Sequence, residues 1–201
     1  MKTKQLLLIF TRNPELGKCK TRLAATIGDQ AALDVYTFLL EHTVKITTSL
    51  AVTKEVFYSE NSIENDLWDA NTYTKKVQEG NDLGKKMENA FAQGFQNGYD
   101  QIIIIGSDMY DLNQSDLEHA FEALHTHDYV IGPAEDGGYY LFGMKSLNSQ
   151  VFKNKEWGTP SVYKDTIKNI KNSKIKILEE RNDVDYYEDI KDIPAFQQFL
   201  N

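Results

Sequence analysis

Asp108 stands where a carboxylate could act on a charged substrate. It ends the apolar run of isoleucines at 102–105, which is followed by Gly106 and Ser107. Consecutive β-branched residues favour a strand that is covered on both faces, as in an α/β sheet. Ligands of open α/β sheets bind just beyond the carboxyl ends of the strands. Asp108 is therefore expected at the mouth of a cleft, where it could hold a divalent cation against phosphate groups.

A second acidic pair, Asp183 and Asp185, follows the last expected strand. Mg²⁺ and Mn²⁺ prefer hard oxygen ligands and often take one or two protein carboxylates together with substrate phosphates. Asp108 and Asp185 would form such a metal site if the fold brings them together. Asp108 could instead cap a helix or turn, although Asn113 and Ser115 are better placed for that role.

A basic loop follows the first expected strand. Residues 12–22 contain four cations, including Arg12, Lys20 and Arg22. Arginine presents a planar fork to phosphate oxygens and lysine a mobile point charge, and Gly17 could let the backbone approach a diphosphate. We interpret the loop as an anion site, although solvated loops carry similar charges. Neither the GxxxxGK[ST] pattern nor a GxGxxG fingerprint is present.

A glycine-rich connection carries two more candidate acids. Glu135 and Asp136 precede Gly137 and Gly138, and Tyr139 opens the next expected strand. The pattern is typical of a β-hairpin turn. Carboxylates on loops at strand ends are also well placed for acid–base catalysis, so either acid could deprotonate a hydroxyl group.

Two single residues are weaker candidates. Trp157 precedes a glycine and could form a platform for an acceptor or belong to a structural loop. Cys19 is the only cysteine, which excludes an intrachain disulfide. Its basic surroundings could lower the pKa of the thiol, but no partner base is evident nearby.

Alternating strands and helices must position these residues, which implies a mainly parallel sheet with one antiparallel element near Gly137. Strands are expected at 6–11, 55–58, 73–77, 102–106, 129–131, 139–144 and 175–178. Helices are expected at 29–49 with Asp29 as cap, at 63–70 and 83–96, from Asn113 or Ser115 to 124, at 161–170, and at 187–200 with a break near Pro194.

The composition limits which class of protein this chain can belong to. The chain has 201 residues, 41% of them hydrophobic and 26% charged, which is ordinary for one globular domain spanning 1–201. The net charge of −8 argues against nucleic acid or an anionic membrane as partner. The apolar run at 6–10 is too short for a signal peptide or a membrane span, so a cytoplasmic location is expected. Oligomeric state is left open.

Six segments, in order, resemble the DUF2064 family, whose members are bacterial GT-A-type glycosyltransferase-like proteins of the nucleotide-diphospho-sugar transferase superfamily. They read IFTRNPELGKCKTRL, QEGNDLGKKMENAF, IIIIGSDM, GPAEDGGYYLFG, WGT and NDVDYYEDI. The resemblance implies a GT-A fold, a three-layer α/β/α sandwich around a mainly parallel mixed sheet.

The resemblance also implies roles for individual residues. The residues that would bind the nucleotide diphosphate, its base and its ribose are Arg12, Gly17, Lys20, Arg22, Gln78, Gly80, Asp82 and Gly84. Asp108 would bind the metal, with Asp185 as second ligand. Glu135 and Asp136 would face the transferred group or the acceptor. A pocket for the sugar or acceptor would involve Gly137, Gly138, Tyr139 and Trp157.

One departure from the family pattern follows the metal aspartate. Family members usually continue with Cys-Pro, whereas this chain has Met109 and Tyr110. The loop beyond Asp108 therefore lacks a rigid proline, and its shape or acceptor preference could differ.

The leading hypothesis is metal-dependent transfer of a sugar from a nucleotide-diphosphate sugar to an unidentified small acceptor. The alternative is a nucleotidyltransferase that uses an NTP and releases pyrophosphate, because residues 20–23 resemble the basic loop of phospholactate guanylyltransferases. The GxGxR loop of many sugar nucleotidyltransferases is absent. A third possibility is a protein that binds nucleotide sugars without catalysis.

Overall fold

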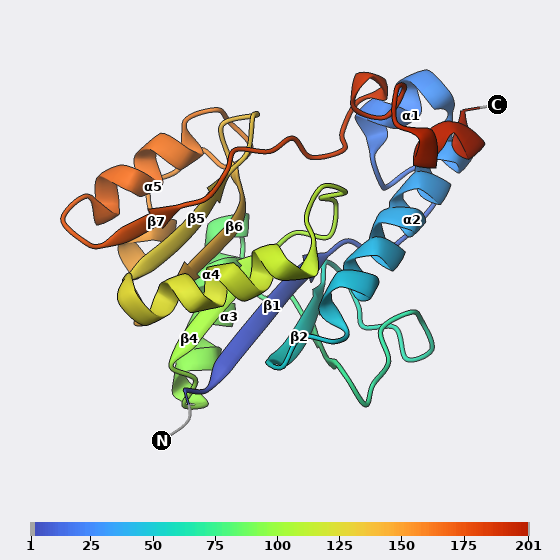
Figure 1. Ribbon diagram of the computed structural model, residues 1–201. Coiled ribbons are helices and arrows are strands. Elements are labelled where there is room, and N and C mark those ends of the chain that lie inside the picture. Colours follow the sequence, from blue (N-terminus) through green and yellow to red (C-terminus); the bar gives the residue numbers. More distant parts are fainter. Residues whose placement is uncertain (1–2, 201) are drawn as a thin grey trace.

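The computed structural model describes residues 3–200 and has a mixed seven-stranded sheet at its centre (Figure 1). The strand order is β3-β2-β1-β4-β6-β5-β7. All neighbouring strands are parallel except β6, which runs antiparallel to both β4 and β5. The strands are β1 (Gln5–Thr11), β2 (Thr53–Tyr58), β3 (Thr74–Val77), β4 (Gln101–Ile105), β5 (Tyr129–Pro133), β6 (Tyr139–Met144) and β7 (Ile175–Ile177).

Helices cover both faces of the sheet. They are α1 (Thr21–Ile27), α2 (Asp29–Thr47), α3 (Leu83–Gln96), α4 (Gln114–Thr126) and α5 (Val162–Ile170). Successive strand residues point to opposite faces. Ile103 and Ile105 of β4 therefore pack with residues of α2 and α4, whereas Ile102 and Ile104 pack with residues of α3 and α5. This α/β/α layering confirms the predicted fold class.

The segment after β7 builds a third, smaller core. Val184, Ile190 and Phe196 are buried against Leu23 of α1 and Leu39 of α2. Figure 1 shows this red segment leaving the β7 edge and reaching α1 and α2. Residues far apart in the sequence thereby meet above the carboxyl ends of the central strands.

Most predicted elements are confirmed, but the helix predicted at 63–70 is wrong. That segment is irregular, and its side chains serve tertiary contacts. Trp68 is fully buried. The Asp66 carboxylate accepts hydrogen bonds from the hydroxyl of Tyr58 and from Lys75 Nζ. These contacts outweigh the weak helical spacing, because propensity is only a weak prior.

Three further differences concern helices. The helix α1 begins at the end of the basic loop and was not predicted. Gly28, with φ 86°, is the N-cap of α2, so the expected cap Asp29 is instead its first residue. The helix predicted at 187–200 is replaced by two short 3₁₀ segments, η2 (Tyr187–Asp189) and η3 (Pro194–Phe199). A third 3₁₀ segment, η1 (Ser149–Phe152), precedes α5.

The parallel strands place their carboxyl ends at one edge of the sheet. Because β6 is antiparallel, the β5–β6 turn lies at this same edge. The basic loop, Asp108 and the glycine-rich turn are thus neighbours. Among helices within residues 3–200, none combines the length and apolar character that a membrane crossing requires.

Candidate functional site

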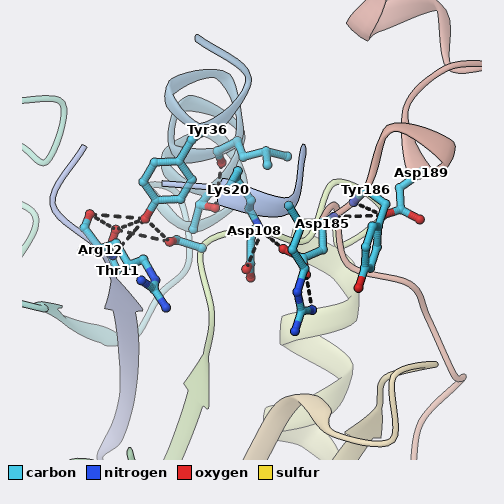
Figure 2. A network of polar contacts seen from close by, with 12 residues as sticks. Thr11, Arg12, Lys20, Tyr36, Asp108, Asp185, Tyr186 and Asp189 are labelled. Atoms are coloured by element: carbon cyan, nitrogen blue, oxygen red, sulfur yellow. Dashed lines mark hydrogen bonds and ion pairs between the residues drawn. The ribbon is translucent and has the colours of Figure 1, made fainter. Parts of the chain in front are cut away.

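A buried hydroxyl network joins the ends of β1 and β4. Tyr36 of α2 places its hydroxyl 3.0 Å from Thr11 Oγ1 and 3.2 Å from Ser107 Oγ, and Ser107 Oγ also donates to Thr11 Oγ1 at 3.2 Å. The backbone N–H of Arg12 donates to the same tyrosine oxygen at 2.8 Å. Figure 2 shows these groups beside Asp108. The network fixes the platform from which Asp108 projects, and no sequence pattern indicated it.

Lys20 is the cation nearest to Asp108. Its Nζ lies 2.9 Å from Asp108 Oδ2 and 3.9 Å from Asp185 Oδ1. The lysine has a left-handed backbone, φ 48° and ψ 47°, at the start of α1, and its side chain is only 7% exposed. Burial opposes its charge, but Asp108 and then Asp185 outweigh this effect and raise the pKa of the ammonium group. The buried lysine therefore stays charged between two carboxylates.

Asp185 reaches this position through contacts of its own loop (Figure 2). The N–H of Val184 donates to the carbonyl oxygen of Asp108 at 3.3 Å. The Asp189 carboxylate accepts from Asp185 N at 2.9 Å. Arg22 Nη1 lies 2.6 Å from Asp185 Oδ2, and its guanidinium group is 5.5 Å from the ring centre of Tyr186. The fold thus brings together the two aspartates that the sequence singled out as metal ligands.

The carboxylate oxygens of Asp108 and Asp185 are suitable ligands for a divalent cation. Asp108 and Asp185 already direct carboxylate oxygens at one ammonium group. Within residues 3–200, no group of three or more His, Cys, Asp or Glu side chains is arranged to hold a metal ion. Mg²⁺ commonly uses only one or two protein carboxylates and completes its shell with phosphates and water. The metal role of the pair stays a prediction.

On one side of Asp108 lies a cavity of about 720 Å³, which we call the basic hollow. Its walls come from the ends of β1, β2 and β3 and from the starts of α1 and α3. The charged and polar side chains that line it include Arg12, Lys18, Lys20, Arg22, Gln78, Asp82, Lys86, Asp108 and Asp185. Its size and positive charge suit a nucleotide diphosphate.

The resemblance assigned Gln78, Gly80 and Asp82 to the base and ribose. All three line the basic hollow, and each also has a structural role. Gln78 Nε2 donates to the carbonyl oxygens of Thr11 at 3.1 Å and Phe57 at 3.0 Å. Asp82 is the N-cap of α3. Gly80 has φ 147°, where a side chain would collide with the backbone of α3.

Two predicted glycines lie elsewhere. Gly17, with φ 73°, is exposed near the Asp29 carboxylate and is not part of the described lining. Gly84 is buried at the start of α3, where a Cβ would lie 2.5 Å from Trp157 Nε1. The missing side chain of Gly84 therefore makes room for Trp157, and its role in nucleotide binding stays a prediction.

On the other side of Asp108 lies a cavity of about 260 Å³, the aromatic hollow. The two hollows share Phe10, Leu83, Gly106 and Asp108. Its further lining includes Met87, Asp136, Gly138, Tyr139, Trp157, Thr159, Val162 and Asp183. Trp157 stands edge-on to Tyr139, with ring centres 6.4 Å apart.

The glycine-rich turn behaves as a hairpin and also supports this hollow. Asp136 Oδ1 accepts from the N–H of Gly138 at 2.7 Å. Gly137 has φ 87°, and a Cβ there would collide with the backbone of Pro160. Of the two candidate acids, the structure places Asp136 in the lining, whereas Glu135 is exposed outside it. Gly138 and Tyr139 lie in the hollow, and Gly137 holds the adjacent loop.

Asp183 is a site residue that the sequence reasoning passed over in favour of Asp185. It lines the aromatic hollow. Burial, then the charge of Asp108 and more weakly that of Asp136, raises the pKa of its carboxyl group to about 6. Its place in the Asp-Val-Asp motif was the available signal, because residues two positions apart in an extended segment point to the same side.

Two further expectations concern residues beside the site. The expected lowering of the Cys19 pKa is wrong, because burial raises it and the thiol donates to the carbonyl oxygen of Asn13. In the Met109-Tyr110 pair, Met109 is buried and lines the aromatic hollow. Tyr110 packs edge-on against Phe196, with ring centres 4.8 Å apart. The departure from Cys-Pro thus anchors the C-terminal segment.

A family model described as an uncharacterized protein conserved in bacteria (DUF2064) matches residues 42–159. This chain belongs to the DUF2064 family. The matched part includes Gln78, Asp108, Asp136 and Trp157. No functionally curated protein matches the chain.

Solved structures show which known proteins share this fold. A candidate nucleotide-diphospho-sugar transferase from Desulfovibrio desulfuricans G20 is 28% identical, with a TM-score of 0.86 over 99% of this chain and 94% of that chain. A 4-diphosphocytidyl-2C-methyl-D-erythritol synthase from Anaerococcus prevotii DSM 20548 is 10% identical, with a TM-score of 0.61 over 97% and 96%. A CMP:2-keto-3-deoxy-manno-octonic acid synthetase, solved with CTP, is 10% identical, with a TM-score of 0.56 over 98% and 99%. This DUF2064 protein therefore has the nucleotide-diphospho-sugar transferase fold, and its structural neighbours are transferases.

Proposed function

We propose that this DUF2064 protein transfers a sugar from a nucleotide-diphosphate sugar to a small acceptor, with a divalent cation. One observation carries the proposal: the basic hollow and the aromatic hollow meet at Asp108. If the diphosphate of the nucleotide sugar lies among the cations of the basic hollow, its sugar would extend past Asp108 toward the aromatic hollow. A transferase needs both sites, because the leaving diphosphate and the acceptor must be held in reactive geometry around the same sugar carbon.

The cations of the basic hollow would bind the diphosphate. Arg22 can offer a fork of N–H donors to phosphate oxygens, and Lys20 a buried positive charge. Arg12 lies exposed at the rim. Asp108 and Asp185 would hold Mg²⁺ or Mn²⁺, which when bound stabilises negative charge on the leaving diphosphate. Such stabilisation of developing charge is usually the largest contribution to catalysis.

The residues present account for each bond change and proton transfer of the proposed reaction. The acceptor oxygen or nitrogen forms a bond to the anomeric carbon, whose bond to the terminal phosphate oxygen breaks. The acceptor proton passes to a carboxylate, for which Asp136 is placed in the aromatic hollow and Glu135 lies next to it. The nucleoside diphosphate leaves with the electron pair.

The nucleotidyltransferase alternative is favoured by the fold of the two synthetases above. Such an enzyme would use an NTP and release pyrophosphate. If its second substrate carried a phosphate group, that group would attack the α-phosphate of the NTP and displace pyrophosphate. The aromatic hollow opposes this arrangement, because its charged lining residues are the carboxylates of Asp108, Asp136 and Asp183. A third possibility, binding of nucleotide sugars without catalysis, leaves the role of these carboxylates unexplained.

A ligand screen followed by product analysis tests the proposal. The thermal stability of the full chain is measured with nucleoside diphosphates, nucleotide sugars and NTPs, with and without Mg²⁺ or Mn²⁺. A ligand at ~100 times its dissociation constant adds about 2.7 kcal/mol to the free energy of unfolding. We expect metal-dependent stabilisation by one nucleoside diphosphate and its sugar conjugates, and release of that diphosphate on turnover. Pyrophosphate release from an NTP would establish the alternative, and binding without turnover the third possibility.

A further inference from the structure

The aromatic hollow has a charge pattern that restricts what can bind in it. Its charged lining residues are Asp108, Asp136 and Asp183, and none of the described residues that line it is a lysine, arginine or histidine. The cations Lys20 and Arg22 line the basic hollow instead. A negatively charged group in the aromatic hollow would therefore meet three carboxylates without a counter-charge from its walls.

The remaining surface of the aromatic hollow is mostly apolar. Phe10, Met87, Tyr139, Trp157 and Val162 form much of its wall. Among residues 3–200, the hydroxyl group of Tyr139 has only the thioether of Met87 as its partner, at 3.9 Å, and such sulfur contacts are weak. The wall therefore favours a ligand that presents an apolar or aromatic face, and it leaves the carboxylates as partners for polar groups of the ligand.

Trp157 and the loop that carries it are held in place before any ligand binds. Gly84 of α3 leaves room for the indole ring of Trp157, and Gly137 leaves room for the backbone of Pro160. Tyr139 meets Trp157 edge-on. These contacts fix residues 157–160 against both α3 and the β5–β6 turn, so the hollow offers a preformed aromatic surface.

We propose that the aromatic hollow selects an acceptor with an apolar or aromatic body, a hydroxyl or amino group, and no negative charge. This inference rests on the proposed function and names its acceptor class. The apolar body would contact Trp157 and Tyr139, and the hydroxyl or amino group would point to the carboxylate of Asp136. Carboxylated and phosphorylated acceptors would be rejected by like charge, a common source of specificity.

A charge-matched series of phenols tests this selection. Tyramine, tyrosol and 4-hydroxyphenylacetate share a ring and a two-carbon chain but carry positive, zero and negative charge. Binding to the full chain is followed by NMR through the indole N–H signals of its two tryptophans, Trp68 and Trp157. The variant Trp157→Phe identifies the signal from the hollow. We expect tyramine and tyrosol to shift the Trp157 signal, and 4-hydroxyphenylacetate to bind roughly 100-fold more weakly, as expected for like charges a few ångströms apart.

Two variants separate the charge effect from the apolar contact. Asp136→Asn with Asp183→Asn should bring the affinity for 4-hydroxyphenylacetate close to that for tyrosol. Trp157→Ala should weaken all three ligands together. Equal or tighter binding of the anion by the unmodified protein overturns the inference, as does the absence of binding by the whole series at millimolar concentration.

Nucleotide binding, measured in parallel, distinguishes this inference from the proposed function. Stabilisation by a nucleoside diphosphate together with the wrong charge order would overturn only the acceptor class. The expected charge order without any nucleotide binding would retain the aromatic hollow as a ligand site and overturn the transferase proposal.

Discussion

The basic hollow and the aromatic hollow lie at one edge of one sheet and share Asp108, yet their walls are chemically opposite. The basic hollow takes its cations from the loop after β1, from α1 and from α3. Besides the shared Phe10 and Asp108, the aromatic hollow takes its rings and carboxylates from β6, the β5–β6 turn, the loop at 157–159 and Asp183. The antiparallel strand β6 makes this division possible, because it brings a hairpin turn to an edge that otherwise holds the carboxyl ends of parallel strands. One change of strand direction thus separates the two binding chemistries.

We expect the largest effect on activity from a substitution of Asp108, which lines both hollows. Asp108→Asn removes a carboxylate from both hollows, so we expect metal-dependent stabilisation by nucleotides to disappear and turnover to fall by roughly 10³-fold. The exposed Asp111→Asn is the matched control. The change also leaves the Lys20 ammonium short of a partner, which lowers stability. Adding Lys20→Met should recover stability but not nucleotide binding, and unchanged metal dependence in Asp108→Asn would remove Asp108 from the site.

The variant Gly84→Ala should affect the aromatic hollow more than the basic hollow. The new methyl group must displace both Trp157 and the carbonyl oxygen of Phe152, so we expect sugar transfer to fall by roughly 100-fold, the scale of an ångström misplacement. Alanine is also a better helix former than glycine by about 1 kcal/mol, so weakening of α3 would not explain the loss. Lys85→Ala in the same turn is the control. Weaker binding of the nucleoside diphosphate itself would instead support the role in base and ribose binding that the resemblance implied.

Asp183 should make the aromatic hollow sensitive to pH in the absence of metal. Its pKa is about 6 in the folded chain, against an ordinary value of 3.8. As pH rises through this window, the unfolded chain loses the proton first, so stability falls and then stays lower by on the order of 2–3 kcal/mol. Asp183→Asn should therefore be more stable than the unmodified protein at pH 7, with the difference shrinking toward pH 4 in urea unfolding. A pH-independent difference, or an equal gain in Asp111→Asn, would contradict this assignment.

The smallest effect is expected at the rim of the basic hollow. Arg22 is 60% exposed, so Arg22→Gln should leave the free energy of unfolding nearly unchanged. It should weaken nucleoside diphosphate binding several-fold and flatten the dependence of binding on salt, as measured by titration calorimetry. Binding of tyrosol in the aromatic hollow should not change. An equal loss in both hollows would show that the two are not independent.

The sequence predicted the sheet well because its strands carry strong local signals. The isoleucine run of β4 is buried on both faces, and Asp108 follows it as expected. The approach of Asp108 and Asp185 to the same lysine, Lys20, was a conditional expectation only for the two aspartates, since it depends on a backbone bond from Val184 that no local pattern encodes. The helix α1 was missed because its seven residues begin at a lysine in a left-handed conformation, without a capping side chain.

The parts of the site that sequence reasoning missed depend on long-range packing. Tyr36 looked like one apolar position on a helix face, but its hydroxyl group connects β1 with β4. Gly84 looked like part of a nucleotide loop, but its role depends on a tryptophan 73 positions further along the chain. Residue types indicated the chemistry at this edge, and only the fold could divide it between two hollows.

The ion pair between Arg22 and Asp185 has a consequence for how the chain acquires its binding site. The pair joins residues 163 positions apart, whereas the hydrogen bond between Gln5 of β1 and Gln101 of β4 spans 96 positions. A contact between residues so far apart in the sequence must first overcome the entropy cost of closing the chain between them. Such contacts therefore form late in folding. The sheet can therefore exist in partly folded molecules that lack an assembled acidic centre. Nucleotide binding would then report on completed folding more strictly than the content of secondary structure does.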